Sequence, residues 1–286
     1  MRLISLKSDY AFKELFSHEN VRKQFLSDVL CIPLEDIKSA KLVNPHLWVR
    51  FRKQKQGILD VLMELNGDVI VNVEMQVRLL KHWLKRQLFY LAKMYTDELK
   101  RGEDYEKLRR CISIAVLDFD LMEGAEYHSV YCLRDRSGEN LTDLFQVHII
   151  ELGKELQGTN AVDDWIRLFN AKRGEELDMI RVKSDGLREA IEILKEMSLS
   201  KSLRYQYEMN LKLKRDRKAE DDYVRDCGRA EGRAEAVIQL LGELEPVPAD
   251  LTDKILREKD QDVLRGWLRT AAKAESVEEF RKDCEV

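Results

Sequence analysis

The chain has 286 residues, a formal net charge of −4, 44% hydrophobic residues and 36% charged residues. This length and composition can bury a sizeable core, as one large domain with an appendage or as two modest domains. No run of 18 apolar residues occurs, so we expect no membrane span and no membrane partner. The N-terminal stretch is too charged for a secretory signal, and the five cysteines are scattered without C-x-x-C spacing. These features predict a cytoplasmic protein with reduced thiols.

Positive charge is concentrated in the first hundred residues. Residues 1–100 carry 17 Lys and Arg against 12 Asp and Glu, a net charge of +5, whereas residues 101–286 carry 32 against 41, a net charge of −9. The overall negative charge argues mildly against a general nucleic-acid-binding protein. The basic N-terminal part nevertheless favours a polyanionic substrate.

The first half of the chain shows helical and extended patterns in turn. Ser8 is a suitable N-cap, and the apolar residues after it recur at helical spacing. Further on, β-branched and aliphatic runs predict strands, and a continuous apolar run from Cys111 predicts a buried strand parallel to a neighbour. In chain order, the predicted elements are a helix at 9–30, a strand at 40–51, strands at 57–65 and 69–77, a helix at 81–101 and a strand at 111–119.

Two further strands are predicted at 127–133 and 145–152, and the pattern is helical from Asn160 onward. A charge-dense helix is predicted at 201–235, either exposed or self-associating. It contains the tandem repeat GRAEGRAEA at 228–236. Because each glycine weakens a helix by roughly 1 kcal/mol, the repeat predicts a flexible joint, although small residues also permit close helix packing. We divide the chain into an α/β core at 1–155, a helical extension with the charged helix at 156–235 and a small helical tail at 236–286.

The strands at 57–65 and 69–77 are separated by Asn-Gly-Asp, which is typical of a hairpin turn because Asn and Gly tolerate positive φ. A three-residue loop pairs Leu65 with Val69, so that apolar side chains face apolar ones and Asp60 lies opposite Glu74. A two-residue loop would invert every side chain of one strand and mix the two faces. We therefore predict the three-residue loop.

Asp60 and Glu74 are the candidate metal ligands. Directly opposed side chains in a sheet have Cβ atoms about 5 Å apart. Two partly buried carboxylates at that separation repel each other strongly unless a cation or a shared proton lies between them. Mg²⁺ or Mn²⁺, which prefer oxygen ligands, would suit this position.

Asp60 followed by Glu74-x-Gln76 on an antiparallel hairpin resembles the metal site of the PD-(D/E)XK nucleases. With SDYAFKELF at 8–16 and WLKRQLFYLAKMY at 83–95, the chain is similar to the recombination-promoting nuclease/putative transposase family of that superfamily. The resemblance covers roughly the N-terminal half of the chain. It implies an α/β fold with a restriction-endonuclease-like αβββαβ core and a mixed sheet, followed by a helical C-terminal region.

The resemblance also implies roles for single residues. Asp60 and Glu74 would hold Mg²⁺, with Mn²⁺ as an alternative. Asp9 either complements the positive end of its helix or adds an acid to the metal site. Gln76 stands where the superfamily usually has lysine; its amide can orient a water but cannot act as a base at neutral pH.

Arg86 is the candidate for the positive charge that Gln76 does not supply. It shares one side of its predicted helix with Trp83 and Tyr90, where the simpler interpretation is an aromatic pair covered by an arginine. The apolar inner face of this helix is predicted at Leu84, Leu88, Leu91 and Tyr95. A basic run at 50–55 is either a solvated loop or a phosphate contact.

The resemblance implies a Mg²⁺-dependent DNA endonuclease that promotes recombination, linked to mobile elements or phage defence, and dimeric so that both strands can be cut. The glutamine at position 76 keeps a second hypothesis open, in which a catalytically degenerate nuclease fold acts as a binding or interaction module. The sequence contains no G-x-x-x-x-G-K loop, no G-x-S-x-G elbow and no histidine pair at metal-ligand spacing. These absences argue against P-loop ATPases, α/β-hydrolases and zinc proteases.

Overall fold

The structure is a computed structural model that describes residues 1–43, 60–156, 158, 160–284 and 286 of the chain. The chain divides into two compact units, at 1–208 and 209–286. The basic run at 50–55 and most of the strand predicted at 40–51 lie outside the described residues.

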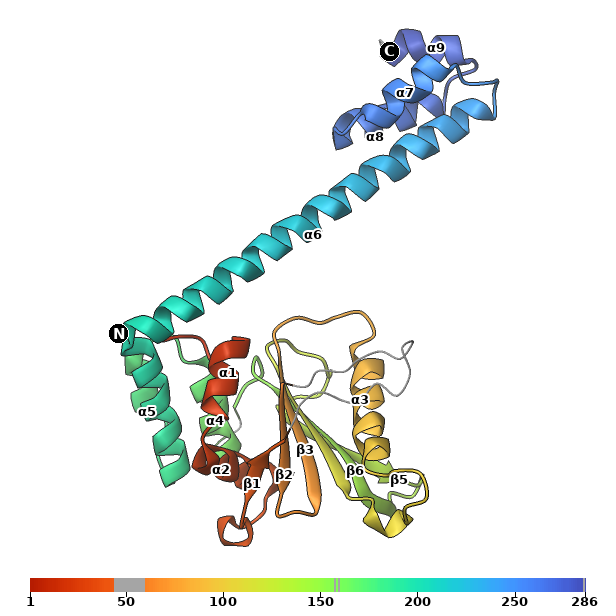
Figure 1. Ribbon diagram of the computed structural model, residues 1–286. Helices are drawn as coiled ribbons and strands as arrows, with labels where there is room; N and C mark the ends of the chain where they lie inside the picture. The colour runs from red at the N-terminus through yellow and green to blue at the C-terminus, as the bar shows by residue number, and fades with distance from the viewer. Residues whose placement is uncertain (44–59, 157, 159, 285) are drawn as a thin grey trace. The chain divides into compact units, whose positions relative to one another are not determined.

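Among the described residues, a six-stranded mixed sheet forms the centre of the first unit (Figure 1). Its strands are β1 (Ala40–Leu42), β2 (Val61–Leu65), β3 (Val69–Gln76), β4 (Arg110–Leu117), β5 (His128–Arg134) and β6 (Asn140–Glu151). The order is β1-β2-β3-β4-β6-β5, with β3–β4 and β4–β6 parallel and the other pairs antiparallel. Short 3₁₀ helices occupy Leu34–Asp36, Tyr105–Lys107 and Gly174–Met179. The predicted α/β fold with a mixed sheet is confirmed.

β2 and β3 form the predicted hairpin. Leu65 pairs with Val69, as a three-residue loop requires. The turn is tight because Asn66 and Gly67 both have positive φ, 54° and 89°. The predicted loop length and register are therefore confirmed, and each strand keeps one apolar face and one face that mixes polar with apolar residues.

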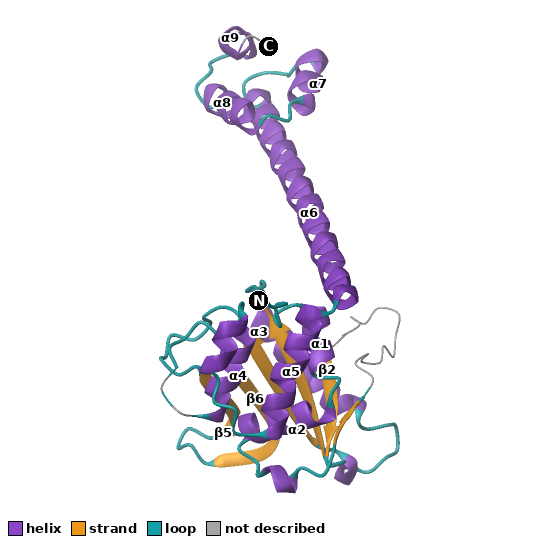
Figure 2. Cartoon of the chain, turned by 90° about the vertical axis from the view of Figure 1, so that its left-hand side faces the viewer, coloured by secondary structure: helices purple, strands orange, loops and turns teal. Residues whose placement is uncertain are grey.

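One face of the sheet is covered by α1 (Asp9–Leu15), α2 (Glu19–Leu30), α4 (Ala161–Asn170) and α5 (Asp185–Leu199), as Figures 1 and 2 show. Phe25 of α2 packs edge-on against Phe16 and Trp165, with ring centroids 5.0 and 5.2 Å apart. Seven apolar residues of β2, β3 and β4 on this face belong to the largest buried core, namely Val61, Met63, Val71, Val73, Ile112, Ile114 and Val116.

The helix predicted at 9–30 is wrong as a single element, because residues 16–18 separate α1 from α2. The side chain of Arg22 is buried at this break. Its Nη1 donates to the carbonyl of Phe16 at 2.8 Å and its Nε to the carbonyl of Ala40 at 2.7 Å. The apolar spacing continues across the break, so the local pattern did not reveal it.

α3 (Trp83–Asp97) covers the other face of the sheet (Figure 1). Its buried residues are Trp83, Gln87, Leu91 and Met94. Of the predicted inner residues, Leu91 is buried and Tyr95 packs partly buried beside it, as predicted. Leu84 and Leu88 are 49% and 59% exposed, so for these two the prediction was wrong. The physical reason is that this face of the sheet is partly polar, and Gln87 meets it.

The regular secondary structure of the second unit's described residues is all helical. It contains most of α6 (Lys201–Gly242), with α7 (Ala249–Arg257), α8 (Gln261–Ala271) and α9 (Val277–Cys284). The GRAEGRAEA repeat lies within α6, and Ala230 and Ala234 are buried in the small core of this unit. The repeat is therefore continuous helix that permits close packing, and the predicted joint was wrong.

Candidate active site

Asp60 lies at the open end of the hairpin, one residue before β2. One further step of the β2–β3 ladder places it opposite Glu74. Its Oδ2 accepts a hydrogen bond from the backbone N of Met75 at 3.1 Å. Because side chains alternate along a strand, Asp60 and Glu74 both belong to the face that α3 covers.

Glu74 is almost completely buried, at 5% exposure. Its Oε1 accepts a hydrogen bond from Nδ2 of Asn72 at 3.1 Å, and its Oε2 accepts one from Nε2 of Gln87 at 2.9 Å. A carboxylate oxygen has more than one lone pair, so both oxygens keep capacity for a further ligand. The two amides fix the carboxylate in one orientation.

The pKa values of both carboxylates are raised. Burial raises the pKa of Asp60, and the negative charge of Asp9 raises it further, while the charges of Lys13 and Arg86 act in the opposite direction. Burial also raises the pKa of Glu74, with the charge of Asp60 as the next cause and Arg86 again opposing. Each buried acid is therefore destabilised as an anion, and Arg86 stabilises both anions.

Gln76 and Arg86 contact each other directly. Nη2 of Arg86 donates to Oε1 of Gln76 at 3.1 Å, and Nε2 of Gln76 donates to the carbonyl of Arg78 at 2.9 Å. The Arg86 guanidinium lies 5.9 Å from the centroid of the Tyr90 ring, within cation–π range. The amide of Gln76 is thus engaged at both ends and positions the arginine.

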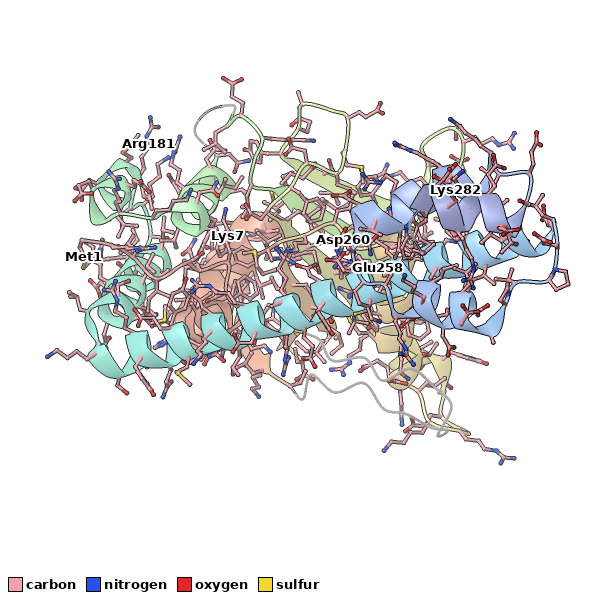
Figure 3. The ribbon with its side chains drawn as sticks, turned by 90° about the horizontal axis from the view of Figure 1, so that it is seen from above. Met1, Lys7, Arg181, Glu258, Asp260 and Lys282 are labelled. Atoms are coloured by element: carbon pink, nitrogen blue, oxygen red, sulfur yellow. The ribbon has the colours of Figure 1, made fainter. Side chains whose placement is uncertain are left out.

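The end of β4 supports the strand that carries the motif. The backbone N of Asp118 donates to the carbonyl of Gln76 at 2.9 Å. Oδ1 of Asp118 forms an ion pair of 2.5 Å with Nζ of Lys7, which Figure 3 labels. Sequence analysis missed this pair because its members are 111 positions apart and no local pattern connects them.

Asp9 lies in the first turn of α1, where its Oδ1 is 3.0 Å from Nζ of Lys13. Its charge reaches Asp60, as the pKa of that residue shows. Within the described parts of the chain, however, no three His, Cys, Asp or Glu side chains lie close enough together to hold a metal ion. A metal-binding role for Asp9 therefore stays a prediction.

Asp60 and Glu74 suit a hard divalent cation. Both are acidic, both are largely buried, and the charge of Asp60 opposes ionisation of Glu74. A cation between them would relieve the repulsion and offset the burial of charge. Carboxylate oxygens are the ligands that Mg²⁺ and Mn²⁺ prefer.

Comparison with protein-family models identifies the fold family. The model described as PD-(D/E)XK nuclease family transposase matches residues 6–223, well over half of the 286 residues. The chain belongs to this family. The match includes Asp9, Asp60, Glu74, Gln76 and Arg86, and it extends beyond the N-terminal half on which the sequence resemblance rests. Comparisons with curated proteins and with solved structures found no match.

Membership of the PD-(D/E)XK nuclease family transposases indicates a nuclease or transposition-related function. The family predicted from the hairpin and its flanking segments is confirmed. No helix in the described part of the chain is long and apolar enough to cross a lipid bilayer.

Sequence analysis missed two residues at this site, Asn72 and Gln87. The signal for Asn72 was its alternation with Glu74, since residues two apart on a strand share a face. The signal for Gln87 was its four-residue spacing from Trp83, which puts both on one side of a helix. The apolar residues Leu84 and Leu88 on the neighbouring stripe concealed this second signal.

Proposed function

We propose that the protein is a Mg²⁺-dependent DNA endonuclease that hydrolyses phosphodiester bonds, with Mn²⁺ as an alternative ion. The observation that carries the proposal is the pair of buried carboxylates, Asp60 and Glu74, on facing positions of the hairpin beside Arg86. The charge of Arg86, on α3, acts on both carboxylates. The family match supports this reaction class.

Asp60 and Glu74 would hold the divalent ion. Once bound, the ion would act as a Lewis acid and lower the pKa of a nearby water. Arg86, held by Gln76 and Tyr90, would neutralise charge on the phosphate of the substrate. Its guanidinium cannot lose a proton near neutral pH, so its role is electrostatic and not that of a base.

Gln76 has a different role from the lysine it replaces. Its amide cannot take a proton at neutral pH. In this structure its oxygen accepts a hydrogen bond from Arg86, so a positive charge lies beside position 76 but belongs to α3. The motif therefore keeps a cation, but on another element.

A plasmid-nicking assay with Mg²⁺ tests the proposal. We expect Asp60→Ala to lower the rate about 1,000-fold, because a lost metal ligand removes several kcal/mol and each 1.36 kcal/mol is a factor of ten. Asp68→Ala is the matched control, since Asp68 is an exposed acid in the turn of the same hairpin. Equal nicking by Asp60→Ala and the wild type would contradict the proposal.

We propose further that the protein acts as a homodimer, so that two sites cut the two strands, and that the breaks promote recombination of mobile elements or phage DNA. The net charge of +5 in residues 1–100 suits a DNA substrate. Light scattering after size-exclusion chromatography tests the dimer, and a linear product from supercoiled plasmid tests cutting of both strands.

A second candidate function is a DNA-binding or interaction module without catalysis. It is favoured by the engaged amide of Gln76 and by the lack of a three-acid group in the described residues. DNA binding in a mobility-shift assay, together with no Mn²⁺ binding by calorimetry and no nicking, would support this function over the first.

A further inference from the structure

α3 contacts the metal-ligand candidate Glu74 through one side chain. Nε2 of Gln87 donates to Oε2 of Glu74 at 2.9 Å, and Gln87 is 2% exposed. The other buried residues of α3 are apolar, namely Trp83, Leu91 and Met94. Burial of an amide is unfavourable unless it is hydrogen-bonded. Gln87 is therefore the polar member of the buried face of α3, and it contacts a carboxylate where the others contact apolar groups.

The orientation of the Gln87 amide is set from its other end. Oγ of Ser113 on β4 lies 3.4 Å from Oε1 of Gln87, and a hydroxyl can donate to that oxygen. The Nε2 group is consequently directed at Glu74. Asn72 donates to the second oxygen of Glu74, so Glu74 is held from both sides by buried side-chain amides.

These contacts do more than fill space. Asn72 and Gln87 each donate to a different oxygen of Glu74, so together they fix the orientation of the carboxylate. Gln87 also follows Arg86 directly, and Arg86 donates to Gln76. Two adjacent residues of α3 thus contact two alternate residues of β3, which fixes the helix against the motif.

We propose that Gln87 is a positioning residue that holds the Glu74 carboxylate oriented for a divalent cation, with Ser113 setting the direction of its amide. The proposal rests on the proposed metal-dependent nuclease. Residues that orient a metal ligand commonly change metal affinity by 10- to 100-fold when they are replaced, about the size expected here.

Mn²⁺ binding by the full-length protein tests this role. We expect Gln87→Met, which keeps the length of the side chain but not the donor, to weaken Mn²⁺ binding about 10-fold in a calorimetric titration without DNA. Gln239→Met is the matched control, an exposed glutamine in α6, and should bind Mn²⁺ like the wild type. In plasmid nicking, the Mg²⁺ concentration for half-maximal rate should rise by a similar factor, while the rate at saturating Mg²⁺ falls much less.

Folded Gln87→Met with the Mn²⁺ affinity of the wild type would overturn the proposal. If Gln87→Met does not fold, Ser113→Ala decides, because it removes only the hydroxyl that orients the amide. Weaker Mn²⁺ binding by folded Ser113→Ala supports the role of Gln87, and unchanged binding overturns it. If the wild-type protein binds no Mn²⁺, the underlying nuclease proposal is refuted. This outcome differs from failure of the Gln87 role alone, in which the wild type binds Mn²⁺ and the variant binds it equally well.

Discussion

The two faces of the central sheet are built from the same strands but differ in chemistry. The face under α1, α2, α4 and α5 presents apolar side chains from β2, β3 and β4 to the largest core. The face under α3 carries Asp60, Asn72, Glu74, Gln76 and Ser113 between two smaller apolar clusters. Neighbouring residues of one strand therefore serve different purposes.

This difference shows how a small sheet can place charge in its interior without losing its fold. Side chains alternate along a strand, so one face can supply hydrophobic stabilisation while the other holds groups that are unfavourable when buried. The raised pKa values of Asp60 and Glu74 mark that unfavourable burial. Substitutions on the two faces should therefore separate activity from stability.

The largest expected effect is on the α3 face. Glu74→Gln should lower plasmid nicking about 1,000-fold, because it removes a charged metal ligand. The thermal unfolding midpoint should change little, since the substitution removes a buried charge but also replaces one oxygen that accepts a hydrogen bond by an NH₂ group that cannot. Nicking assays and calorimetric melts measure the two quantities. A strongly lowered midpoint would show that this face also stabilises the fold.

The adjacent residue on the other face should behave in the opposite way. Val73 is completely buried in the apolar core. Val73→Ala should lower the free energy of unfolding by about 2 kcal/mol through lost burial and a small cavity. Urea unfolding measures this loss, and nicking per folded molecule should stay close to that of the wild type. Loss of nicking without loss of stability would contradict the proposed difference between the two faces of the sheet.

Close packing on the apolar face can be tested at Gly186, where α5 meets α2. A Cβ at Gly186 would lie 2.5 Å from Cβ of Gln24 and 2.7 Å from the carbonyl of Asn20. Gly186→Ala should therefore destabilise the first unit by about 1–3 kcal/mol through overpacking. Gly228→Ala is the control, because a Cβ there meets no atom within 4 Å. A Gly186→Ala protein as stable as the wild type would contradict this packing.

The effect that is smallest at neutral pH concerns a polar pair at the margin of the apolar face. Nε2 of His128 lies 3.1 Å from Nδ1 of His148, and His148 shares the face of Ile150. Burial lowers the pKa of His148 to about 3 and also lowers that of His128. Between pH 6.5 and about 3 the unfolded chain therefore binds a proton at His148 that the folded chain does not, and stability falls as pH falls.

His148→Gln, which retains hydrogen-bonding groups but does not titrate, should reduce this loss by up to about 1.4 kcal/mol per pH unit. Urea midpoints of both proteins between pH 7.5 and 4.5 measure the slopes. A residual slope is expected from His128, whose pKa is lowered in the same direction. Identical slopes for the two proteins would mean that His148 is not the group responsible.

Much of the candidate site could be predicted from local pattern. The Asn-Gly turn and the alternation of the two strands fix the register, and the register alone places Asp60 opposite Glu74. Arg86 was predicted as the compensating cation, and the structure brings it to Gln76. The contribution of Asp9 was left open by the sequence and is left open by the geometry as well.

The amino-acid sequence alone determined the hairpin, its loop length and the α/β class, because these follow from the residues of the turn and from the two-residue period of a strand. Only the tertiary structure decided that the first helix divides at residues 16–18 and that α3 turns Gln87, not Leu88, toward the sheet. Both outcomes depend on partners remote in sequence: the carbonyl of Ala40, which accepts a hydrogen bond from Arg22, and the buried carboxylate of Glu74, which accepts one from Gln87. A periodic apolar pattern records which residues avoid water, but it cannot record where a buried polar group will find its partner.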